Sequence, residues 1–194
     1  PPPPMPDDDG IETLVRDRML IVPLGHVPSC PSTQDLAGER CDGGSPPPDA
    51  VFWADHQTSG RGRQRREWHD EPGLDLAVTF RVRAELPVPV RLPAALPVAV
   101  LQALEALANV PLRIKWPNDL FANGRKLCGV LVDRGGRGDD PYLIGIGVNV
   151  NRTRFPPDLE VLATSLALVT GREFDRGEVL LAIAERLDAL LHAL

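Results

Sequence analysis

The sequence predicts an α+β fold in which a mixed, largely antiparallel sheet packs against helices. Strand-like patterns lie both before and after a helical pattern, without the regular strand and helix alternation of a parallel sheet. In the second half of the chain, dense apolar runs are separated by glycine-rich turns, which is typical of consecutive antiparallel strands. With 194 residues, of which 43% are hydrophobic, the chain is long enough for one well-buried domain.

Two proline-rich segments interrupt the apolar pattern near the N-terminus. The opening PPPPMPDDDG cannot bury enough apolar surface to offset its ordering entropy, so we expect residues 1–14 to form a Pro/Asp-rich tail. The segment CDGGSPPPDA, at 41–50, has the composition of a surface loop. Residues 15–194 show no internal repeat and are expected to form one domain.

The first clear strand is predicted at residues 76–83, where apolar side chains alternate with polar or smaller ones. Residues 94–108 follow with leucines at helical spacing. We expect Pro97 to confine the regular helix to its C-terminal side, because proline lacks an N–H and its ring collides with the preceding turn. A helix therefore follows the strand.

The remaining elements complete the sheet and close the chain. PLRIKW, RKLCGVLVD and YLIGIGVNV predict further strands, around the turns ANG and RGGRGDDP. Asp175 and Glu178 match a capping pair at the start of a last helix. The apolar residues of that helix share one face: Leu180, Ile183, Leu187, Leu190, Leu191 and Leu194.

Charge and cysteine content narrow the class of protein. A net charge of -6 argues against a protein that coats nucleic acid, although it allows a local basic patch. No stretch approaches the roughly 20 apolar residues that span a bilayer, and no secretion signal is recognisable. Cys30, Cys41 and Cys128 have neither disulfide-framework nor zinc-site spacing. We therefore expect a cytoplasmic protein without a membrane partner.

The segment SGRGRQRREW, residues 59–68, places four arginines within six positions of an acidic chain. Its glycines let backbone N–H groups approach an anion, and guanidinium groups donate in pairs to phosphate or carboxylate. Trp68 could stack on a base. An anion-binding lid is thus predicted, while a solvated turn and an arginine-rich RNA-binding segment remain the alternatives.

Further along, KWPNDL places Lys115 and Asp119 four residues apart around a proline that forbids an ordinary helix. Both could then face one cleft, although a simple turn closed by Asn118 and Asp119 is an equal alternative. Lys126 lies near Gly129 in an apolar strand, where glycine often marks the close approach of a ligand. Otherwise Lys126 would be an ordinary surface lysine.

Four segments, QTSGRGRQRREW, KWPNDL, RKLCGVLVD and IGIGVNVN, resemble the catalytic domain of biotin protein ligases in their order and spacing. The resemblance extends from PSTQDLA at 31–37 through LATSLALVTGREFDR to the last helix. It implies a class II synthetase-like fold and an enzyme that uses ATP and Mg²⁺. Such an enzyme activates biotin as biotinyl-5'-AMP and transfers it to a lysine of a biotin carboxyl carrier protein.

The resemblance implies a role for each matching residue. Biotin would be bound by Ser32, Thr33, Gln57, Gly60, Arg61, Lys126 and Gly129. The nucleotide would be bound by Arg63, Arg66, Trp68, Asn118 and Asn149. The metal would be held by Asp119. The catalytic cations would be Lys126, Lys115, Arg63 and Arg66.

These roles agree with the physics of the implied reaction. A carboxylate that approaches a phosphate meets a repulsion of about 4 kcal/mol per close charge pair at an effective dielectric constant near 20. Catalysis must therefore gather cations around the reacting oxygens. The arginine loop and the two lysines would supply them.

The sequence departs from the family pattern at several positions. Arg65 stands where the arginine motif usually has its third glycine, Gln34 where asparagine is usual, and Pro31 where an acid is common. If position 65 needs a positive φ, Arg65 costs on the order of 1 to 2 kcal/mol, and Arg65→Gly should raise activity. We expect neither an N-terminal helix-turn-helix nor a C-terminal small β-barrel domain, and hence no DNA partner. A homodimer is compatible with the resemblance but not required by it.

Three other functions are compatible with parts of the sequence. A degenerate relative would bind biotin or nucleotide without turnover, although the retention of Lys115, Asp119 and Lys126 argues against it. A lipoate or octanoate ligase would use the same chemistry, but the arginine-serine-glycine-glycine signature of lipoate ligases is missing. Nucleic-acid binding by the arginine loop would weaken steeply with salt.

Overall fold

The computed structural model describes residues 22–39, 50–82, 91–134 and 141–193. Within these ranges, seven strands form one sheet in the order β1-β2-β3-β7-β6-β5-β4. The first pair, β1 (Val22–Val27) and β2 (Ala50–Ala54), is parallel, and every other neighbouring pair is antiparallel. The predicted mixed, largely antiparallel sheet is confirmed.

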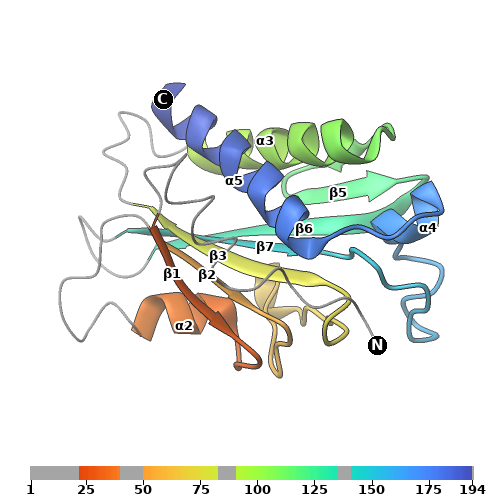
Figure 1. Cartoon of the computed structure of the whole chain (residues 1–194), viewed down its shortest axis with the longest axis horizontal. Coiled ribbons are helices and arrows are strands. Elements are labelled where there is room, and N and C mark those ends of the chain that lie inside the picture. The colour runs from red at the N-terminus through yellow and green to blue at the C-terminus, as the bar shows by residue number, and fades with distance from the viewer. Residues whose placement is uncertain (1–21, 40–49, 83–90, 135–140, 194) are drawn as a thin grey trace.

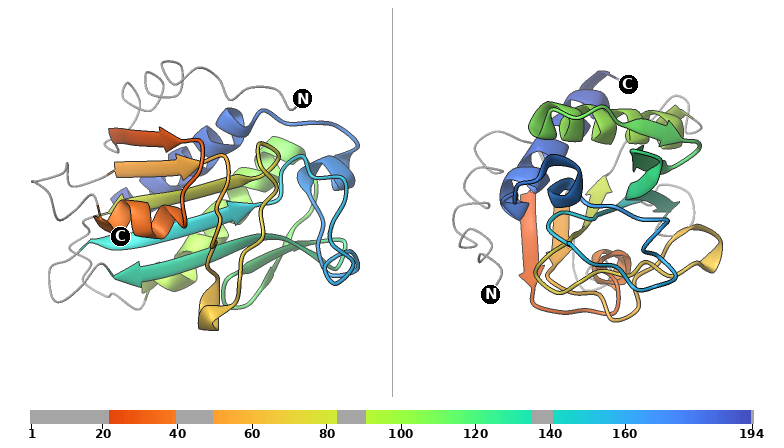
Figure 2. Two further views of the ribbon diagram at one scale, coloured as in Figure 1. Left: turned by 90° about the horizontal axis from the view of Figure 1, so that it is seen from below. Right: turned by 90° about the vertical axis from the view of Figure 1, so that its right-hand side faces the viewer.

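Helices cover the two faces of this sheet unequally (Figure 1). Two long helices, α3 (Arg91–Ala108) and α5 (Arg176–Ala193), lie side by side over one face. The short helix α2 (Thr33–Glu39) lies on the opposite face, and a further short helix, α4 (Leu166–Thr170), lies at one end of the sheet. Figure 2 shows the same layers from below and from one side. No helix within the described residues has the length and apolar content to cross a bilayer.

The central strands follow the predicted apolar segments closely. β3 (Leu76–Val82) matches the expected strand at 76–83. PLRIKW and the segments after it form β4 (Arg113–Lys115), β5 (Asp119–Ala122), β6 (Arg125–Arg134) and β7 (Tyr142–Val148). The first strands and α2 carry no clear period of their own, so the sequence did not predict them. The expected tail, most of the loop at 41–50 and the turn around 135–140 lie outside the described residues.

The expectation for Pro97 was wrong. Helix α3 begins at Arg91 and continues through Pro97. Leu92 and Leu96, in the first turns, are fully buried. Their packing between helix and sheet offsets the hydrogen bond that proline cannot make, because most helical stability in proteins comes from tertiary packing.

The start of the last helix matches its prediction. The Asp175 carboxylate accepts a hydrogen bond from the N–H of Glu178 at 2.9 Å, as a capping residue should. Leu180, Ile183 and Leu187 are buried against α3 and the sheet. The main core therefore lies between the sheet and the two long helices. Among the described residues, the opposite face carries a small apolar cluster under α2.

Candidate active site

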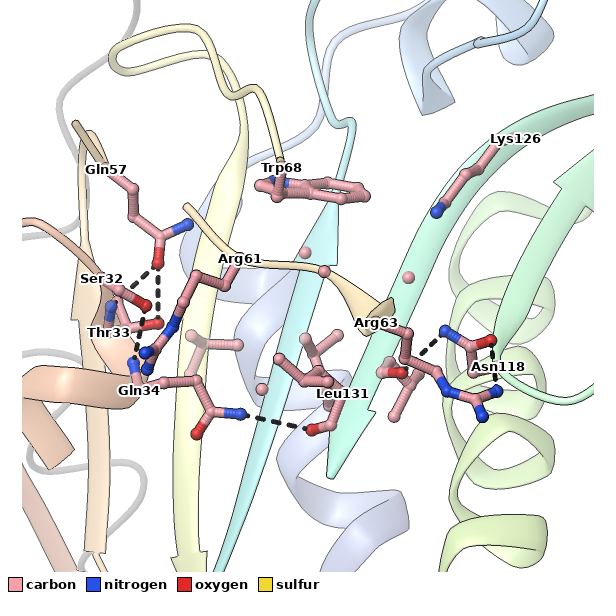
Figure 3. A pocket seen from close by; sticks show the side chains of 17 residues that line it. Ser32, Thr33, Gln34, Gln57, Arg61, Arg63, Trp68, Asn118, Lys126 and Leu131 are labelled. Carbon is pink, nitrogen blue, oxygen red and sulfur yellow. Dashed lines mark hydrogen bonds between the residues drawn. The ribbon is translucent and has the colours of Figure 1, made fainter. Parts of the chain in front are cut away.

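A cleft opens on the α2 side of the sheet, between the start of α2, the long connection from β2 to β3, and strands β6 and β7 (Figure 3). We call it the inner cleft. The predicted residues that line it are Ser32, Thr33, Gln57, Arg61, Arg63, Trp68, Asn118, Lys126 and Gly129. Its apolar wall includes Val130, Leu131 and Ile146. Segments far apart in the sequence therefore meet at one site.

One end of the inner cleft is a polar cluster at the start of α2. The Gln57 side-chain oxygen accepts hydrogen bonds from the Thr33 N–H at 2.8 Å and from the Thr33 hydroxyl at 3.1 Å. The Thr79 hydroxyl donates to that of Thr33 at 2.9 Å. The Ser32 hydroxyl oxygen accepts from the N–H of Gln34 at 3.3 Å. Because these groups are buried, they hold one another in position.

The floor of the cleft is made of glycines on adjacent strands. Gly129 of β6 lies opposite Gly147 of β7 in the ladder. A Cβ atom at Gly147 would lie 2.4 Å from Trp68 Cε2, and one at Gly129 would lie 3.2 Å from Trp68 Cζ3. The space above these glycines is thus occupied by the indole of Trp68. The missing side chain of Gly129 leaves room for Trp68 and for the side chain of Lys126. The close approach of a ligand to Gly129 stays a prediction.

The arginine segment forms a narrow hairpin within the β2–β3 connection. The Trp68 N–H donates to the Gly60 carbonyl at 2.9 Å, and the Gly62 N–H donates to the Arg66 carbonyl at 2.7 Å. A Cβ atom at Gly60 would lie 2.5 Å from the Trp68 carbonyl oxygen, so only glycine fits there. Gly60 therefore closes the base of the hairpin without lining the inner cleft.

The tip of this hairpin is the 3-10 turn η1 (Arg63–Arg65). Gln64 adopts the left-handed conformation there, with φ 57° and ψ 35°. A positive φ had been considered at Arg65, because the family pattern usually has a glycine there. The left-handed residue of this turn instead lies one position earlier.

Two of the arginines are held at the cleft. Arg61 forms an ion pair with Asp35 of α2, with 2.6 Å between the guanidinium nitrogen and the carboxylate oxygen. Arg63 donates to the side-chain oxygen of Asn118 at 3.3 Å. Asn118 is itself fixed, because its side-chain nitrogen donates to the Val130 carbonyl at 3.1 Å. The hairpin is thereby tied to both walls.

A second, outer cleft adjoins the first. Lys115, Asp119 and Arg66 line it, and it shares Gly62, Arg63, Trp68, Asn118 and Lys126 with the inner cleft. Lys115 and Asp119 are direct partners across the β4–β5 pair. The prediction that both residues face one cleft is therefore confirmed.

Lys126 lies where the two clefts meet. Its ammonium is 2.9 Å from the Asp119 carboxylate and 5.4 Å from the centre of the Trp68 ring. Lys115 lies 5.1 Å from the Phe121 ring centre. Lys126 is partly exposed and Lys115 is exposed, so both amines can exchange their present partners for an incoming anion.

Asn149 is not part of either cleft. It is buried, and its side-chain nitrogen donates to the carbonyls of Thr164 at 2.8 Å and Lys126 at 3.4 Å. In this structure Asn149 therefore supports the backbone that carries Lys126. Its predicted contact with adenine stays a prediction.

The described residues contain no cluster of three or more histidine, cysteine or acidic side chains that could hold a metal by themselves. Asp119 nevertheless suits Mg²⁺, which typically takes one or two carboxylates together with phosphate oxygens. Asp119 lies in the cationic outer cleft, where phosphates would bind. The residues present therefore fit a metal that arrives with a nucleotide.

The sequence did not reveal the buried arginines that hold the two ends of the β2–β3 connection. Arg152 is paired with the Asp75 carboxylate and donates to the His69 carbonyl at 2.9 Å. Arg176 donates to the Asp55 carboxylate at 2.8 Å and to the Asp75 carbonyl at 3.3 Å. Burial raises the pKa of Asp75, and the Arg152 guanidinium opposes this rise. Asp55 and Asp75 are the two ends of the β2–β3 connection, so both ends are clamped.

Comparison with known proteins shows to which protein family this chain is related. The sequence profile of the biotin/lipoate A/B protein ligase family matches residues 27–151. The bifunctional ligase/repressor BirA of Bacillus spizizenii is 38% identical over 177 residues, which are 88% of this chain and 53% of BirA. A biotin–acetyl-CoA-carboxylase ligase of Mycobacterium tuberculosis is 34% identical over 146 residues, 72% of this chain and 53% of that protein. The chain thus spans about half the length of these relatives.

Solved structures agree with the expected fold. The biotin protein ligase from Aquifex aeolicus in complex with biotin and ATP superposes with a TM-score of 0.77 and 32% identity, covering 88% of this chain and 70% of that one. The Leishmania major biotin protein ligase in complex with biotinyl-5-AMP, with a TM-score of 0.72 and 23% identity, shares the fold. The chain therefore belongs to the biotin/lipoate A/B protein ligase family.

Proposed function

We propose that this chain activates biotin with ATP, as biotinyl-5'-AMP, and transfers it to a lysine of a biotin carboxyl carrier protein. The observation that carries the proposal is the junction of the two clefts. A polar inner cleft and a cationic outer cleft share Arg63, Trp68 and Lys126. An acid bound in the first would present its carboxylate to a nucleotide phosphate bound in the second.

The inner cleft has groups suited to a polar head followed by an apolar chain. Ser32, Thr33 and Gln57 would hold the ureido ring of biotin, and Val130, Leu131 and Ile146 would contact the aliphatic tail. This arrangement supports biotin over lipoate or octanoate. An apolar head group would offer no hydrogen bonds to Ser32, Thr33 and Gln57, which are buried polar residues.

In the outer cleft, Arg63, Arg66 and Lys115 would bind the phosphates, and Trp68 would stack on the base. Mg²⁺, held through Asp119 and the nucleotide phosphates, would supply further charge neutralisation. An oxygen of the biotin carboxylate attacks the α-phosphorus, and the bond to pyrophosphate breaks. Lys126, released from Asp119, would hold the carboxylate and offset its repulsion from the phosphate.

In the second half-reaction, the neutral amine of the carrier lysine attacks the acyl carbon of the adenylate. An amide bond forms, the bond to AMP breaks, and the amine loses its proton. Until the carrier arrives, the hairpin would protect the reactive anhydride from water. The ion pairs of Asp55 and Asp75, at the two ends of the β2–β3 connection, would keep the hairpin positioned over the cleft.

We further propose that the protein acts in the cytoplasm and does not bind DNA. Cys30 and Cys128 are free thiols, as expected in a reducing compartment. Arg61 and Arg63 of the hairpin line the inner cleft and contact Asp35 and Asn118, which suits a small anionic ligand better than a nucleic-acid duplex.

The test is pyrophosphate release from Mg-ATP by the purified chain with biotin, lipoate, octanoate or no acid. We expect release that depends on biotin, followed by biotin incorporation into a carrier domain. Release with lipoate or octanoate alone would reassign the substrate. Biotin binding without any release would support the degenerate relative instead.

A further inference from the structure

Three arginines of the hairpin reach different parts of the site. Arg63 and Arg66 line the outer cleft, where phosphates would bind, and Arg61 does not. The Arg61 side chain instead extends from the hairpin toward the start of α2, whereas that of Arg63 extends the opposite way, toward Asn118 (Figure 3). Arg61 therefore differs in its surroundings from the cations of the outer cleft.

The partner of Arg61 is Asp35, the third residue of α2. The guanidinium nitrogen and the carboxylate oxygen are 2.6 Å apart, which makes a short, charge-assisted hydrogen bond. The two side chains are 50% and 40% exposed, so the pair can open into water without leaving a buried charge behind. We call the Arg61–Asp35 pair the latch, because it joins the hairpin to a helix that lies 26 positions earlier in the chain.

The latch lies at one side of a hairpin that crosses the inner cleft. On the other side, Arg63 donates to the Asn118 oxygen at 3.3 Å, a longer contact between one charged and one neutral group. The Trp68 N–H donates to the Gly60 carbonyl at 2.9 Å, so the two arms of the hairpin stay together when it moves. Movement of the hairpin away from α2 therefore requires the latch to break.

The binding of both substrates leaves the latch intact. The outer cleft offers the phosphates three other cations, which are Arg63, Arg66 and Lys115. Lys126, at the junction of the clefts, is available to the carboxylate of the acid. The Arg61 guanidinium can therefore stay on Asp35 while acid and nucleotide are bound.

We propose that Asp35 is a positioning residue, which acts through Arg61 to keep the hairpin closed over bound biotinyl-AMP. This inference rests on the proposed function. The adenylate must stay on the protein between the two half-reactions, because water hydrolyses the anhydride once it is released. An exposed ion pair changes an equilibrium constant by a factor of about two to five, so the latch should slow the escape of the adenylate to that extent.

The experiment measures the release of biotinyl-AMP rather than turnover. The full chain is loaded with biotin and with Mg-ATP that carries a radiolabelled α-phosphate, and an excess of unlabelled biotinyl-AMP is then added. Loss of label from the protein gives the dissociation rate constant. The variants are Asp35→Asn, which removes the charge at the same shape, and Asp35→Glu, which keeps it. Asp158→Asn is the matched control, because Asp158 is exposed and lines neither cleft.

We expect Asp35→Asn to raise the dissociation rate constant about two- to fivefold at low salt. Asp35→Glu should recover most of the loss, and Asp158→Asn should behave as the unaltered chain. Salt should speed release more in the unaltered chain than in Asp35→Asn, because the exposed charges of the latch are screened. Only molecules that have bound the adenylate contribute to this rate constant, so a partly unfolded sample does not change it.

A double-mutant cycle distinguishes a latch from a general effect of Asp35 on the helix. Arg61→Gln removes the other partner, and we expect Asp35→Asn to add less than about 1.5-fold in that background. A purely structural role of Asp35 in α2 would instead speed release equally with and without the Arg61 guanidinium.

Two results would overturn the inference while leaving the proposed function in place. One is an unchanged release rate for Asp35→Asn at low salt. The other is a full additional effect of Asp35→Asn in the Arg61→Gln background, since Asp35 would then act without Arg61. Failure of the unaltered chain to form biotinyl-AMP would refute the proposed function and this inference together.

Discussion

Arg152 and Asp75 form an ion pair that is almost wholly buried, with side-chain exposures of 4% and 1%. Asp75 ends the β2–β3 connection, and Arg152 also holds the His69 carbonyl within it. The Asp75 carboxylate accepts further hydrogen bonds from the backbone N–H groups of Glu71 and Val150. The pair therefore joins the hairpin over the cleft to the end of the sheet.

Removing one partner of this pair should be strongly destabilising. Arg152→Met leaves the Asp75 carboxylate buried without its partner, and we expect the free energy of unfolding to fall by about 3 to 5 kcal/mol. Urea titration followed by circular dichroism measures the change. The double substitution Arg152→Met with Asp75→Leu should recover part of the loss. A loss below about 1 kcal/mol for the single variant would contradict this account.

Lys126→Met should greatly slow the first half-reaction. The substitution removes the cation at the junction of the clefts, and we expect formation of biotinyl-AMP to slow by about 100-fold or more. Single-turnover experiments with radiolabelled ATP measure the rate. Arg125→Met is the matched control, because Arg125 is exposed and lines neither cleft. Equal rates for the two variants would mean that Lys126 is only a surface charge.

Gly147→Ala should displace the indole of Trp68. The new methyl group would lie 2.4 Å from the indole ring, which is too close for non-bonded atoms. Because the ring is rigid, Trp68 must move away from β7. We expect a change in tryptophan emission and about tenfold weaker nucleotide binding. Gly38→Ala serves as control, since its Cβ would meet only Leu143 Cδ1, at 3.9 Å. Unaltered emission from Gly147→Ala would show that Trp68 does not rest on this glycine.

The hairpin tip should respond to glycine at position 64 and not at position 65. Gln64 has a φ of 57°, a conformation that costs other residues about 1 kcal/mol and glycine little. Gln64→Gly relieves this strain, whereas Arg65→Gly adds only chain entropy to the unfolded state, at about 0.4 to 1 kcal/mol. Gln64→Gly should therefore unfold at higher urea concentration than Arg65→Gly. The reverse order would restore position 65 as the strained one.

The thiols of Cys30 and Cys128 should be unreactive at neutral pH. Burial, with Asp70 and Asp35 nearby, raises the pKa of Cys30 to about 11. Burial also raises the pKa of Cys128, which is fully enclosed. Because the thiolate is the reactive form, iodoacetamide should label Cys30 slowly at pH 8 and faster as the pH rises toward 11, and should spare Cys128 in the folded protein. Peptide mapping by mass spectrometry measures the labelling of each cysteine. Rapid labelling of Cys30 or Cys128 at pH 8 would contradict the burial of these groups.

From the sequence alone, the α+β class, the central strands and many of the residues that line the two clefts could be predicted. Alternation in β3 and the apolar segments of β6 and β7 are local patterns that need no knowledge of distant residues. The residues of the site lie in short motifs, so their order along the chain already indicates their chemistry. For the same reason, the position of Lys115 and Asp119 at one cleft could be anticipated from a single short motif.

Only the tertiary structure decided how distant residues meet. The position of the Trp68 indole depends on Gly129 and Gly147, which lie on two other strands. The ion pair of Asp55 depends on Arg176, a residue 121 positions away. Helix α3 continues through Pro97 because it packs against the rest of the fold, and the hydrogen bond of Asn149 to the Thr164 carbonyl is likewise a tertiary contact. The side chain of Gln34 packs over Gly145, a contact between α2 and β7 that buries its amide oxygen. Such contacts have no local signal, because burial and partner are set by the whole fold.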